Sequence, residues 1–279
     1  MQLSLRLSAI ADMVTEGNRL VDVGCDHGYL PVYLIQQKKI PSAIAMDVRK
    51  GPLSRAQEHI RQYGLEEYIQ TRLSDGLVSL EAGEGDTLVI AGMGGPLMER
   101  ILTDGQSVRD SFSELILQPQ SDIPHFRRYI QSQGWGIVEE KMVEEDGKFY
   151  PMMRVVRGNA EESLDFGDRQ KEESGEFVSG KRNGSKQTRS EMQDTPYTLQ
   201  EAFGKYLLQE KNPVLYRYLL REARIRTEIL KQLEAAEKTD REKKENSGES
   251  RAAALAARVS QVREEAQLIT AALAEYESK

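Results

Sequence analysis

The chain has 279 residues, a formal net charge of −7 and one cysteine, Cys25. This length predicts one large domain or two modest ones with a sizeable core, and a single cysteine excludes an internal disulfide, which suits a reducing compartment. No stretch approaches the roughly 20 apolar residues of a membrane span, the first residues lack an apolar signal core, and the acidic balance disfavours a generic nucleic-acid binder without a local basic face. We therefore expect a cytoplasmic protein with no membrane partner.

The first predicted elements lead into a glycine-rich turn. Apolar residues at helical spacing predict a helix over residues 3–14, residues 19–23 form a predicted buried strand, and a second helix begins at Tyr29. Residues 22–28 between them have the pattern D-x-G-x-x-x-G. Its glycines allow the backbone to bend tightly and to approach a ligand. Because a helix N-terminus and the carboxyl end of a strand meet there, the turn is predicted to line the ligand-binding crevice of an open α/β sheet.

Two acidic residues follow the next predicted strands. Strand 42–48 carries Asp47 at its end, roughly 20 residues beyond the glycine turn, where an acidic side chain accepts ribose hydroxyls in nucleotide-binding folds. The alternative is an ordinary exposed aspartate at a strand end. After helix 52–63, strand 68–73 leads to Asp75, which is placed to accept a hydrogen bond from an exocyclic adenine amine.

A second glycine turn follows the fourth predicted strand. Strand 87–91 carries no charge and continues into Gly-Met-Gly-Gly at residues 92–95. We expect this turn beside the first at the edge of the sheet, where its glycines would let the backbone lie against a ligand; the alternative is a tight turn without a ligand. The fifth strand, residues 114–120, has polar residues at its carboxyl end.

The alternation of strands and helices ends in a predicted hairpin. Residues 137–143 and 148–156 flank the turn Asp146-Gly147, a two-residue hairpin signal. The pattern over residues 19–156 predicts an α/β fold, with a mostly parallel Rossmann-like sheet that helices cover on both faces and that an antiparallel pair completes. A dinucleotide-binding domain has a parallel sixth strand instead, so a nicotinamide cofactor is disfavoured.

The remainder of the chain divides into a polar segment and a helical region. Residues 158–195 are rich in Glu, Lys, Ser, Gly and Gln, a composition that predicts a disordered insertion without chemistry. The pattern then predicts helical segments at residues 197–209, 213–236 and 252–276. A polar linker at residues 237–250 separates the last two. We therefore expect three regions: 1–157, 158–195 and 196–279.

The last predicted helix has the alternating four-and-three spacing of a coiled-coil seam, so the two long helices are predicted to form an antiparallel hairpin. The pattern leaves open whether they pair within one chain or between chains. Exposed arginines of this hairpin, among them Arg221 and Arg224, are either a solvated surface balanced by neighbouring glutamates or a basic stripe that faces RNA.

The motifs together resemble a known family. The D-x-G-x-x-x-G turn with Asp47 and Asp75 resembles the S-adenosyl-L-methionine site of class I methyltransferases. The segments DVGCDHGYLP, IAGMGG, LILQPQ and EEDGKFYPMMR are similar, in this order, to the bacterial tRNA (adenine-22-N1)-methyltransferase family, whose members act on adenosine 22 in the D-arm and carry a C-terminal coiled coil. The resemblance covers residues 1–157 and 196–277, and the polar stretch between them departs from the family pattern.

The resemblance implies roles for individual residues. It places the first glycine turn at the methionine part of the cofactor, Asp47 at the ribose, and the second glycine turn beside the transferring methyl and the incoming base. The implied cofactor-binding residues are Asp22, Gly24, Cys25, Gly28, Asp47, Val48, Asp75, Gly76, Gly92, Met93 and Gly94. The resemblance also implies that Asp22 and Asp26 orient the loop or the cofactor amine, and that His27, Tyr29 and Gln118 are candidates for the pocket around the target adenine. Our candidate catalytic residues are Asp26, His27 and Tyr29, and our candidate substrate-binding residues are Gln118, Arg6, Arg221 and Arg224.

The expected chemistry makes few demands on side chains. In methyl transfer from a sulfonium the protein mainly contributes proximity and orientation. Adenine N1 has a free lone pair, so no base is required, and Asp26 is a candidate to stabilise the cationic product. His27 is either a general base or an ordinary packing residue, and Cys25 is either reactive or, more simply, a small buried side chain. The three histidines have no metal-ligand spacing, so no metal is expected.

Three functions remain open at this point. The first is tRNA methylation, in which the paired target base must be flipped out and the helical hairpin would hold the tRNA body through phosphate contacts. The second is methylation of a different RNA, a small molecule or a protein. The third is a cofactor-binding scaffold that acts through its coiled coil. The family resemblance favours the first, with tRNA as partner and a monomer or weak dimer as the assembly.

Overall fold

The computed structural model describes residues 1–158, 196–242 and 249–277, and these divide into two units, Met1–Tyr197 and Thr198–Lys279. The predicted insertion lies outside the described residues except for Gly158, so its disorder stays a prediction. Within the described part, no helix is long and apolar enough to cross a membrane.

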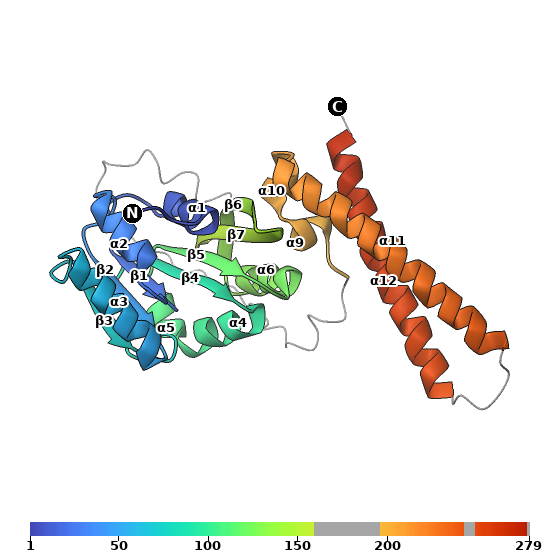
Figure 1. The fold of residues 1–279 in the computed structure, drawn as a ribbon, viewed down its shortest axis with the longest axis horizontal. Helices are drawn as coiled ribbons and strands as arrows, with labels where there is room; N and C mark the ends of the chain where they lie inside the picture. Colours follow the sequence, from blue (N-terminus) through green and yellow to red (C-terminus); the bar gives the residue numbers. More distant parts are fainter. Residues whose placement is uncertain (159–195, 243–248, 278–279) are drawn as a thin grey trace, which may run out of the picture. The chain divides into compact units, whose positions relative to one another are not determined.

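Strands and helices of the first unit alternate much as the sequence pattern predicts (Figure 1). Its elements are α1 (Leu5–Met13), β1 (Leu20–Val23), α2 (Tyr29–Gln36), β2 (Ala43–Asp47), α3 (Lys50–Gln62), β3 (Ile69–Leu73), β4 (Thr87–Met93), α4 (Gly95–Asp104), α5 (Gln106–Arg109), β5 (Glu114–Pro119), α6 (Ile123–Ser132), β6 (Trp135–Glu145) and β7 (Lys148–Arg157). The short helix α5 has no counterpart in the sequence prediction, and the hairpin strands β6 and β7 are longer than predicted.

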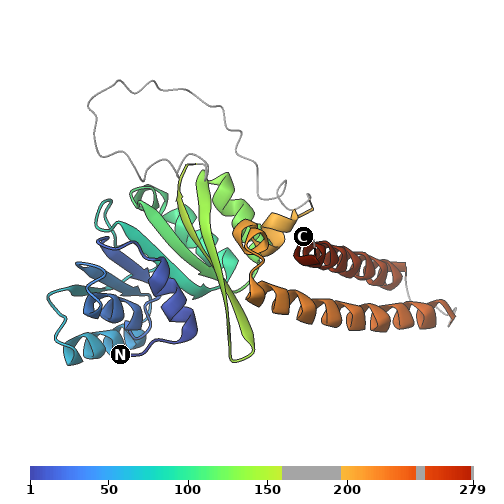
Figure 2. The ribbon, with the colours of Figure 1, turned by 90° about the horizontal axis from the view of Figure 1, so that it is seen from above.

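The seven strands form one sheet in the order β3-β2-β1-β4-β5-β7-β6. Strands β1 to β5 pair in parallel, whereas β7 is antiparallel to both β5 and β6. Helix α2 contacts α1 and α3, and α4 contacts α5 and α6, so that helices cover both faces of the sheet (Figures 1 and 2). The predicted α/β class, with a mostly parallel sheet and a terminal antiparallel pair, is confirmed.

The strand order fixes where a ligand can bind. From β1 the chain proceeds outward through β2 and β3, and then returns to β4 on the other side of β1 before proceeding to β5. The carboxyl ends of β1 and β4 therefore border the point where the strand order reverses, which is the usual ligand crevice of an open α/β sheet. Both predicted glycine turns follow these two strands.

Glu114 fastens the opposite, amino-terminal edge of the sheet. Its buried carboxylate accepts hydrogen bonds from the Thr15 amide at 2.9 Å, the Thr15 hydroxyl at 2.8 Å and the Thr87 hydroxyl at 2.6 Å. The Asn18 side-chain amide donates a longer bond at 3.4 Å. Hydrogen bonds to a charged acceptor are stronger than neutral ones, so one residue joins the segment after α1 to the first residues of β4 and β5.

Helices are the regular elements of the second unit within its described residues (Figure 1). Its elements are α9 (Leu199–Phe203), α10 (Lys205–Gln209), α11 (Pro213–Glu242) and α12 (Glu249–Glu277). The single helix predicted over 197–209 is wrong, because Gly204 has φ +95° and separates α9 from α10. Part of the predicted linker at 237–250 is also helical, since α11 continues to Glu242 and α12 begins at Glu249.

Helices α11 and α12 pack against each other as the predicted hairpin. Their buried apolar side chains are Leu215 and Leu219 on α11 and Val259, Val262, Ile269 and Ala272 on α12. Ion pairs lie along the margins of this seam, with Arg226 Nε 2.6 Å from Glu265 Oε2 and Arg263 Nη2 2.8 Å from Glu234 Oε1. The predicted hairpin is confirmed as an intramolecular pair of helices.

Candidate active site

The first glycine turn is fastened to the neighbouring strand by its backbone. The amides of Gly24 and Cys25 donate to the Met46 carbonyl of β2 at 2.8 and 2.9 Å. Gly24 has φ +80°, and a Cβ there would lie 2.4 Å from Met93 Cε. Gly28 has φ +67° and caps the N-terminus of α2. The turn therefore requires glycine at both positions, and Met93 of the second turn packs directly over the first.

Asp22 is a buried carboxyl group at the end of β1. Burial raises its pKa to about 7; the Arg6 guanidinium opposes this rise and the Asp47 carboxylate adds to it. A carboxyl group that loses its hydration in this way strongly favours a neighbouring cation. Asp22 is thus a site where a positively charged ligand group would be stabilised.

Asp47 is buried at the end of β2, only 6% exposed. Its Oδ1 accepts a hydrogen bond from the Arg49 amide at 2.8 Å. The alternative of an ordinary exposed strand-end aspartate is therefore wrong. Val48, which follows it, is 58% exposed, so this apolar side chain lies at the surface beside a buried acceptor.

Gln118 joins the second glycine turn to the first helix. This side chain of β5 is fully buried, and its Oε1 accepts from the Gly92 amide at 3.1 Å and from Arg6 Nη1 at 3.3 Å. Its Nε2 donates to the Pro119 carbonyl at 3.1 Å. Gly92 has φ +78°. Both ends of the Gln118 amide are thus engaged, and they hold Arg6 at the carboxyl edge of β4 and β5.

Tyr150 is a residue of this region to which the sequence interpretation gave no role. The Arg6 guanidinium lies over the Tyr150 ring, 5.7 Å from its centroid. Tyr150 belongs to β7, and it lies within the segment EEDGKFYPMMR that carries part of the family resemblance. That segment was the available signal. The contact depends on the pairing of β7 with β5, which no local pattern specifies.

Asp26, His27 and Tyr29 surround the exposed side of the first turn. Asp26 has φ +48°, and its side chain, 64% exposed, lies 3.7 Å from both His27 Nε2 and Arg55 Nη2. The His27 and Tyr29 rings stack with centroids 5.2 Å apart. Asp26 and Tyr29 are thus exposed to solvent whereas Asp22 is buried, and the predicted catalytic roles of Asp26, His27 and Tyr29 stay predictions.

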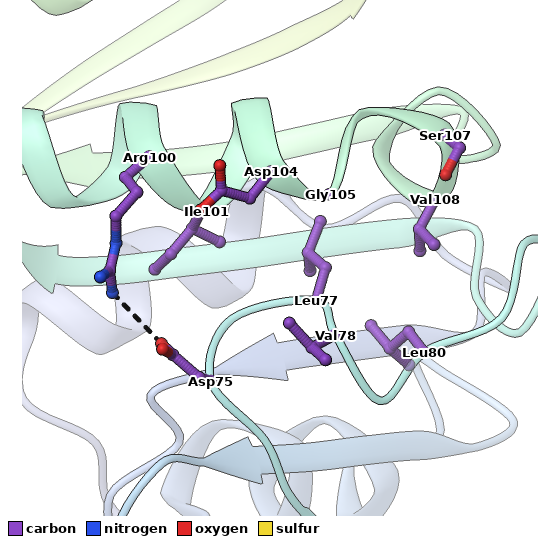
Figure 3. Close-up of a pocket in the computed structure, with 10 residues that line it drawn as sticks. All are labelled: Asp75, Leu77, Val78, Leu80, Arg100, Ile101, Asp104, Gly105, Ser107 and Val108. Atoms are coloured by element: carbon purple, nitrogen blue, oxygen red, sulfur yellow. Dashed lines mark hydrogen bonds and ion pairs between the residues drawn. The ribbon is translucent and has the colours of Figure 1, made fainter.

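Asp75 and Gly76 follow β3, and Asp75 borders a pocket of about 300 Å³ (Figure 3). Asp75 is exposed and forms an ion pair with Arg100 of α4, at 3.2 Å. Figure 3 shows the two side chains pointing toward each other across the gap between the loop and the helix. Gly76 lies against α4, since a Cβ there would be 3.0 Å from Ile101. Asp75 is thus paired with a cation rather than presented as a free acceptor.

The remaining predicted residues fall into three places. Gly94 caps the N-terminus of α4, and a Cβ there would lie 3.0 Å from Ser121 Oγ. Cys25 is buried, and burial raises the pKa of its thiol well above the ordinary value, so it is a packing residue and not a reactive thiolate. Arg221 and Arg224 are exposed on α11 of the second unit.

Among the residues that the structure describes, no three acidic, histidine or cysteine side chains group as metal ligands.

Comparisons with known proteins place this geometry in a family. Residues 3–153 match the family model described as a methyltransferase domain. The chain is 34% identical over 165 residues to the tRNA (adenine(22)-N(1))-methyltransferase of Bacillus subtilis (strain 168), which covers 59% of this chain and 69% of the relative.

Two solved structures extend the likeness over nearly the full length. The B. subtilis M1A22 tRNA methyltransferase TrmK is 26% identical with a TM-score of 0.71, covering 98% of this chain and 99% of that one. A Streptococcus pneumoniae protein, solved in complex with S-adenosyl-L-methionine, is 30% identical with a TM-score of 0.69, covering 98% and 100%.

Proposed function

The chain belongs to the methyltransferase domain family, and within it to the tRNA (adenine(22)-N(1))-methyltransferases, and we propose on this premise that it methylates N1 of adenosine 22 in the D-arm of tRNA. The observation that carries the proposal is the 34% identity to the B. subtilis enzyme over 165 residues, 69% of that enzyme. S-adenosyl-L-methionine is the cofactor, as in the S. pneumoniae complex.

The residues at the carboxyl edge of the sheet fit this cofactor. Its methionine part carries a cationic amine, and Asp22 is a buried carboxyl whose raised pKa marks it as a group in need of a cation. Its ribose presents two hydroxyls, and Asp47 is a buried acceptor at the end of the neighbouring strand. Between them, Gly24 and Gly28 carry no side chain that would obstruct a ligand.

The chain's own groups then have mainly binding and orienting roles. When bound, the cofactor supplies an electrophilic methyl group on a sulfonium. Asp22 would hold its amine and Asp47 its ribose hydroxyls, and Met93, packed over Gly24, would exclude water from the space between the glycine turns. No side chain has to remove a proton, because N1 of adenine is already unprotonated. Such a site acts through orientation.

We assign the pocket for the target base to the region of Arg6, Gln118 and Tyr150. Because both ends of the Gln118 amide are engaged within the protein, Gln118 is a positioning residue for Gly92 and Arg6. The base must leave its stack before N1 is accessible, and an aromatic ring such as that of Tyr150 offers it a face to stack on. Asp26, His27 and Tyr29 stay catalytic candidates on the other side of the turn.

The hairpin of α11 and α12 would hold the tRNA body. Its exposed Arg221 and Arg224 would contact phosphates, which position a nucleic acid without reading its sequence. We place the enzyme in the cytoplasm with its substrate, and expect a monomer or weak dimer, since the hairpin seam is filled within one chain.

The decisive experiment measures methyl incorporation from labelled S-adenosyl-L-methionine into unmodified tRNA transcripts. A transcript with guanosine in place of adenosine 22 is the matched control, and mass spectrometry maps the product. We expect incorporation that disappears with the substitution. Incorporation that persists would move the target to another nucleotide. Absence of incorporation while calorimetry shows intact cofactor binding would favour a different substrate or a binding scaffold.

A further inference from the structure

Four rings form a continuous row beside the first glycine turn. We name His27, Tyr29, His59 and Tyr63 the aromatic row. Its successive ring centroids are 5.2, 4.9 and 5.0 Å apart, with the first pair stacked and the other two edge-to-face. These separations are typical of favourable aromatic pairs, so the four rings form one connected set and are not independent surface side chains.

The row is held in place by the backbone around it. His59 belongs to the last turn of α3, and Tyr63 is the C-cap residue that follows this helix. The helix packs against the turn through Ala56, since an added Cβ at Gly28 would lie 3.3 Å from Ala56 Cβ. The His59 ring nitrogen Nδ1 lies 3.1 Å from the His27 carbonyl oxygen. The contact of His59 with the His27 backbone thus joins the ring pair of α3 to the ring pair of the turn.

Both tyrosines nevertheless remain open to solvent. Tyr29 is 40% exposed and Tyr63 is 38% exposed. A large aromatic surface that is rigid and incompletely buried is the arrangement by which proteins stack unpaired bases, since every base offers a flat face whatever its sequence.

Charges of both signs surround the row. The exposed basic side chains at the start of α3 and along it are Arg49, Lys50, Arg55 and Arg61. The exposed acidic neighbours are Asp26, which already pairs with Arg55, Glu58 on α3, and Glu66 and Glu67 just after Tyr63. Cations interleaved with ring faces are suited to a nucleic-acid strand, whose phosphates and bases alternate in the same way.

We propose that the aromatic row is a stacking surface for unpaired bases of the tRNA substrate, on the other side of the first glycine turn from the pocket assigned to the target adenosine. The inference rests on the proposed function and adds a surface to it. Two of the rings, His27 and Tyr29, flank Gly28 in the glycine turn, and the other two extend the surface away from it along α3. The row would thus support bases near the flipped nucleotide, while Arg55 and its neighbours contact the phosphates between them.

Tyr63 offers the cleanest test, because it lies at the far end of the row and has no role in the catalytic or cofactor site. We expect Tyr63→Leu to weaken binding of unmodified tRNA roughly fivefold or more, the loss associated with one base–aromatic stack. Tyr63→Phe keeps the ring and should bind as the wild type does. Tyr68→Leu is the matched control, since Tyr68 is 48% exposed and forms no ring contact among the described residues. It should leave tRNA binding unchanged.

Three readouts separate the possible results. The tRNA dissociation constant and KM should rise in Tyr63→Leu alone, whereas cofactor affinity and kcat at saturating tRNA should stay at wild-type values. An equal loss in Tyr63→Phe, an equal loss in Tyr68→Leu, or a parallel loss of cofactor affinity would overturn the proposal. The proposed function fails separately, if wild-type protein transfers no methyl group to tRNA.

A set of transcripts with single abasic sites at unpaired nucleotides of the D-loop locates the stacked base. One such site should weaken wild-type binding by the same factor as Tyr63→Leu, and should cause no further loss in that variant, because contacts between the same two groups are not additive. Additive losses at every abasic site would overturn the proposal even if Tyr63→Leu binds tRNA poorly.

Discussion

The two units of the chain differ in what they bury. All ten buried polar or charged residues, among the side chains that the structure describes, belong to the first unit. The buried residues of the α11–α12 hairpin are apolar, and its ion pairs lie at the margin of the seam. Burying a polar group costs free energy unless it is engaged. The first unit therefore buries polar side chains, such as Asp22 and Gln118, that cost free energy unless they have partners. Within its described residues the hairpin buries apolar side chains only and keeps its charged side chains at the surface.

The largest expected effect separates the two units. Deleting residues 196–279 should abolish methylation of tRNA while it leaves the dissociation constant of S-adenosyl-L-methionine unchanged, because the proposed cofactor contacts all belong to the first unit. Calorimetry and a methyl-incorporation assay on the same preparation measure both quantities. Normal turnover on tRNA by the shortened protein would show that the hairpin has no part in substrate binding.

The next largest effect is expected on cofactor affinity when the first glycine turn is changed. Gly24→Ala should weaken cofactor binding at least roughly tenfold. An alanine there adopts a positive φ, which costs about 1 kcal/mol, and its Cβ, 2.4 Å from Met93 Cε, displaces the Met93 side chain from its place between the glycine turns. Gly17→Ala is the control, since Gly17 also has a positive φ, +85°, but its Cβ would meet no atom within 4 Å. Equal losses of affinity in the two variants would mean that general destabilisation of the fold, and not the place of Gly24 in the turn, is responsible.

Asp22 should make cofactor binding depend on pH. Its pKa of about 7 in the folded protein lies above the ordinary value of 3.8. Between pH 3.8 and pH 7 the folded protein therefore retains a proton that the unfolded chain releases. The contribution of Asp22 to the free energy of unfolding consequently falls as pH rises through this range. A cation binds better to the ionised form, so affinity should rise roughly fivefold from pH 6 to pH 7.

Calorimetry in buffers of different ionisation enthalpy would detect the proton that binding releases. Asp22→Asn removes the titrating group and should bind more weakly, with no rise in affinity over this pH range. The same pH dependence in this variant would assign the titration to another group.

The smallest expected effect belongs to the hairpin. The single variants Arg221→Ala and Arg224→Ala should each weaken tRNA binding a few-fold and lower the slope of log affinity against log salt by about one, with no change in cofactor affinity. Filter binding at several salt concentrations measures the slope. An unchanged slope in both variants would identify this face of α11 as a solvated surface.

The sequence predicted the elements that local patterns encode, and missed contacts between distant segments. Apolar runs and the two glycine turns were sufficient for the parallel sheet and for the crevice at β1 and β4. Hydropathy underestimated the lengths of β6 and β7. Pairing between the two strands extends β6 to Glu145 and β7 to Arg157, beyond the apolar residues that the pattern detects. It also predicted one helix where Gly204 separates two. The Arg6–Tyr150 contact and the Asp75–Arg100 pair each join elements that only the assembled sheet brings together.

The Glu114 cluster has a consequence for how this scaffold can change. It fastens β4 and β5 at the amino-terminal edge, whereas the glycine turns, Asp22 and Asp47 follow the opposite ends of the strands. Substitutions in the loops at the carboxyl edge leave these fastenings intact. The loops at the carboxyl edge can therefore change during evolution, and with them the substrate, while the Glu114 hydrogen bonds at the amino-terminal edge keep the strands in place.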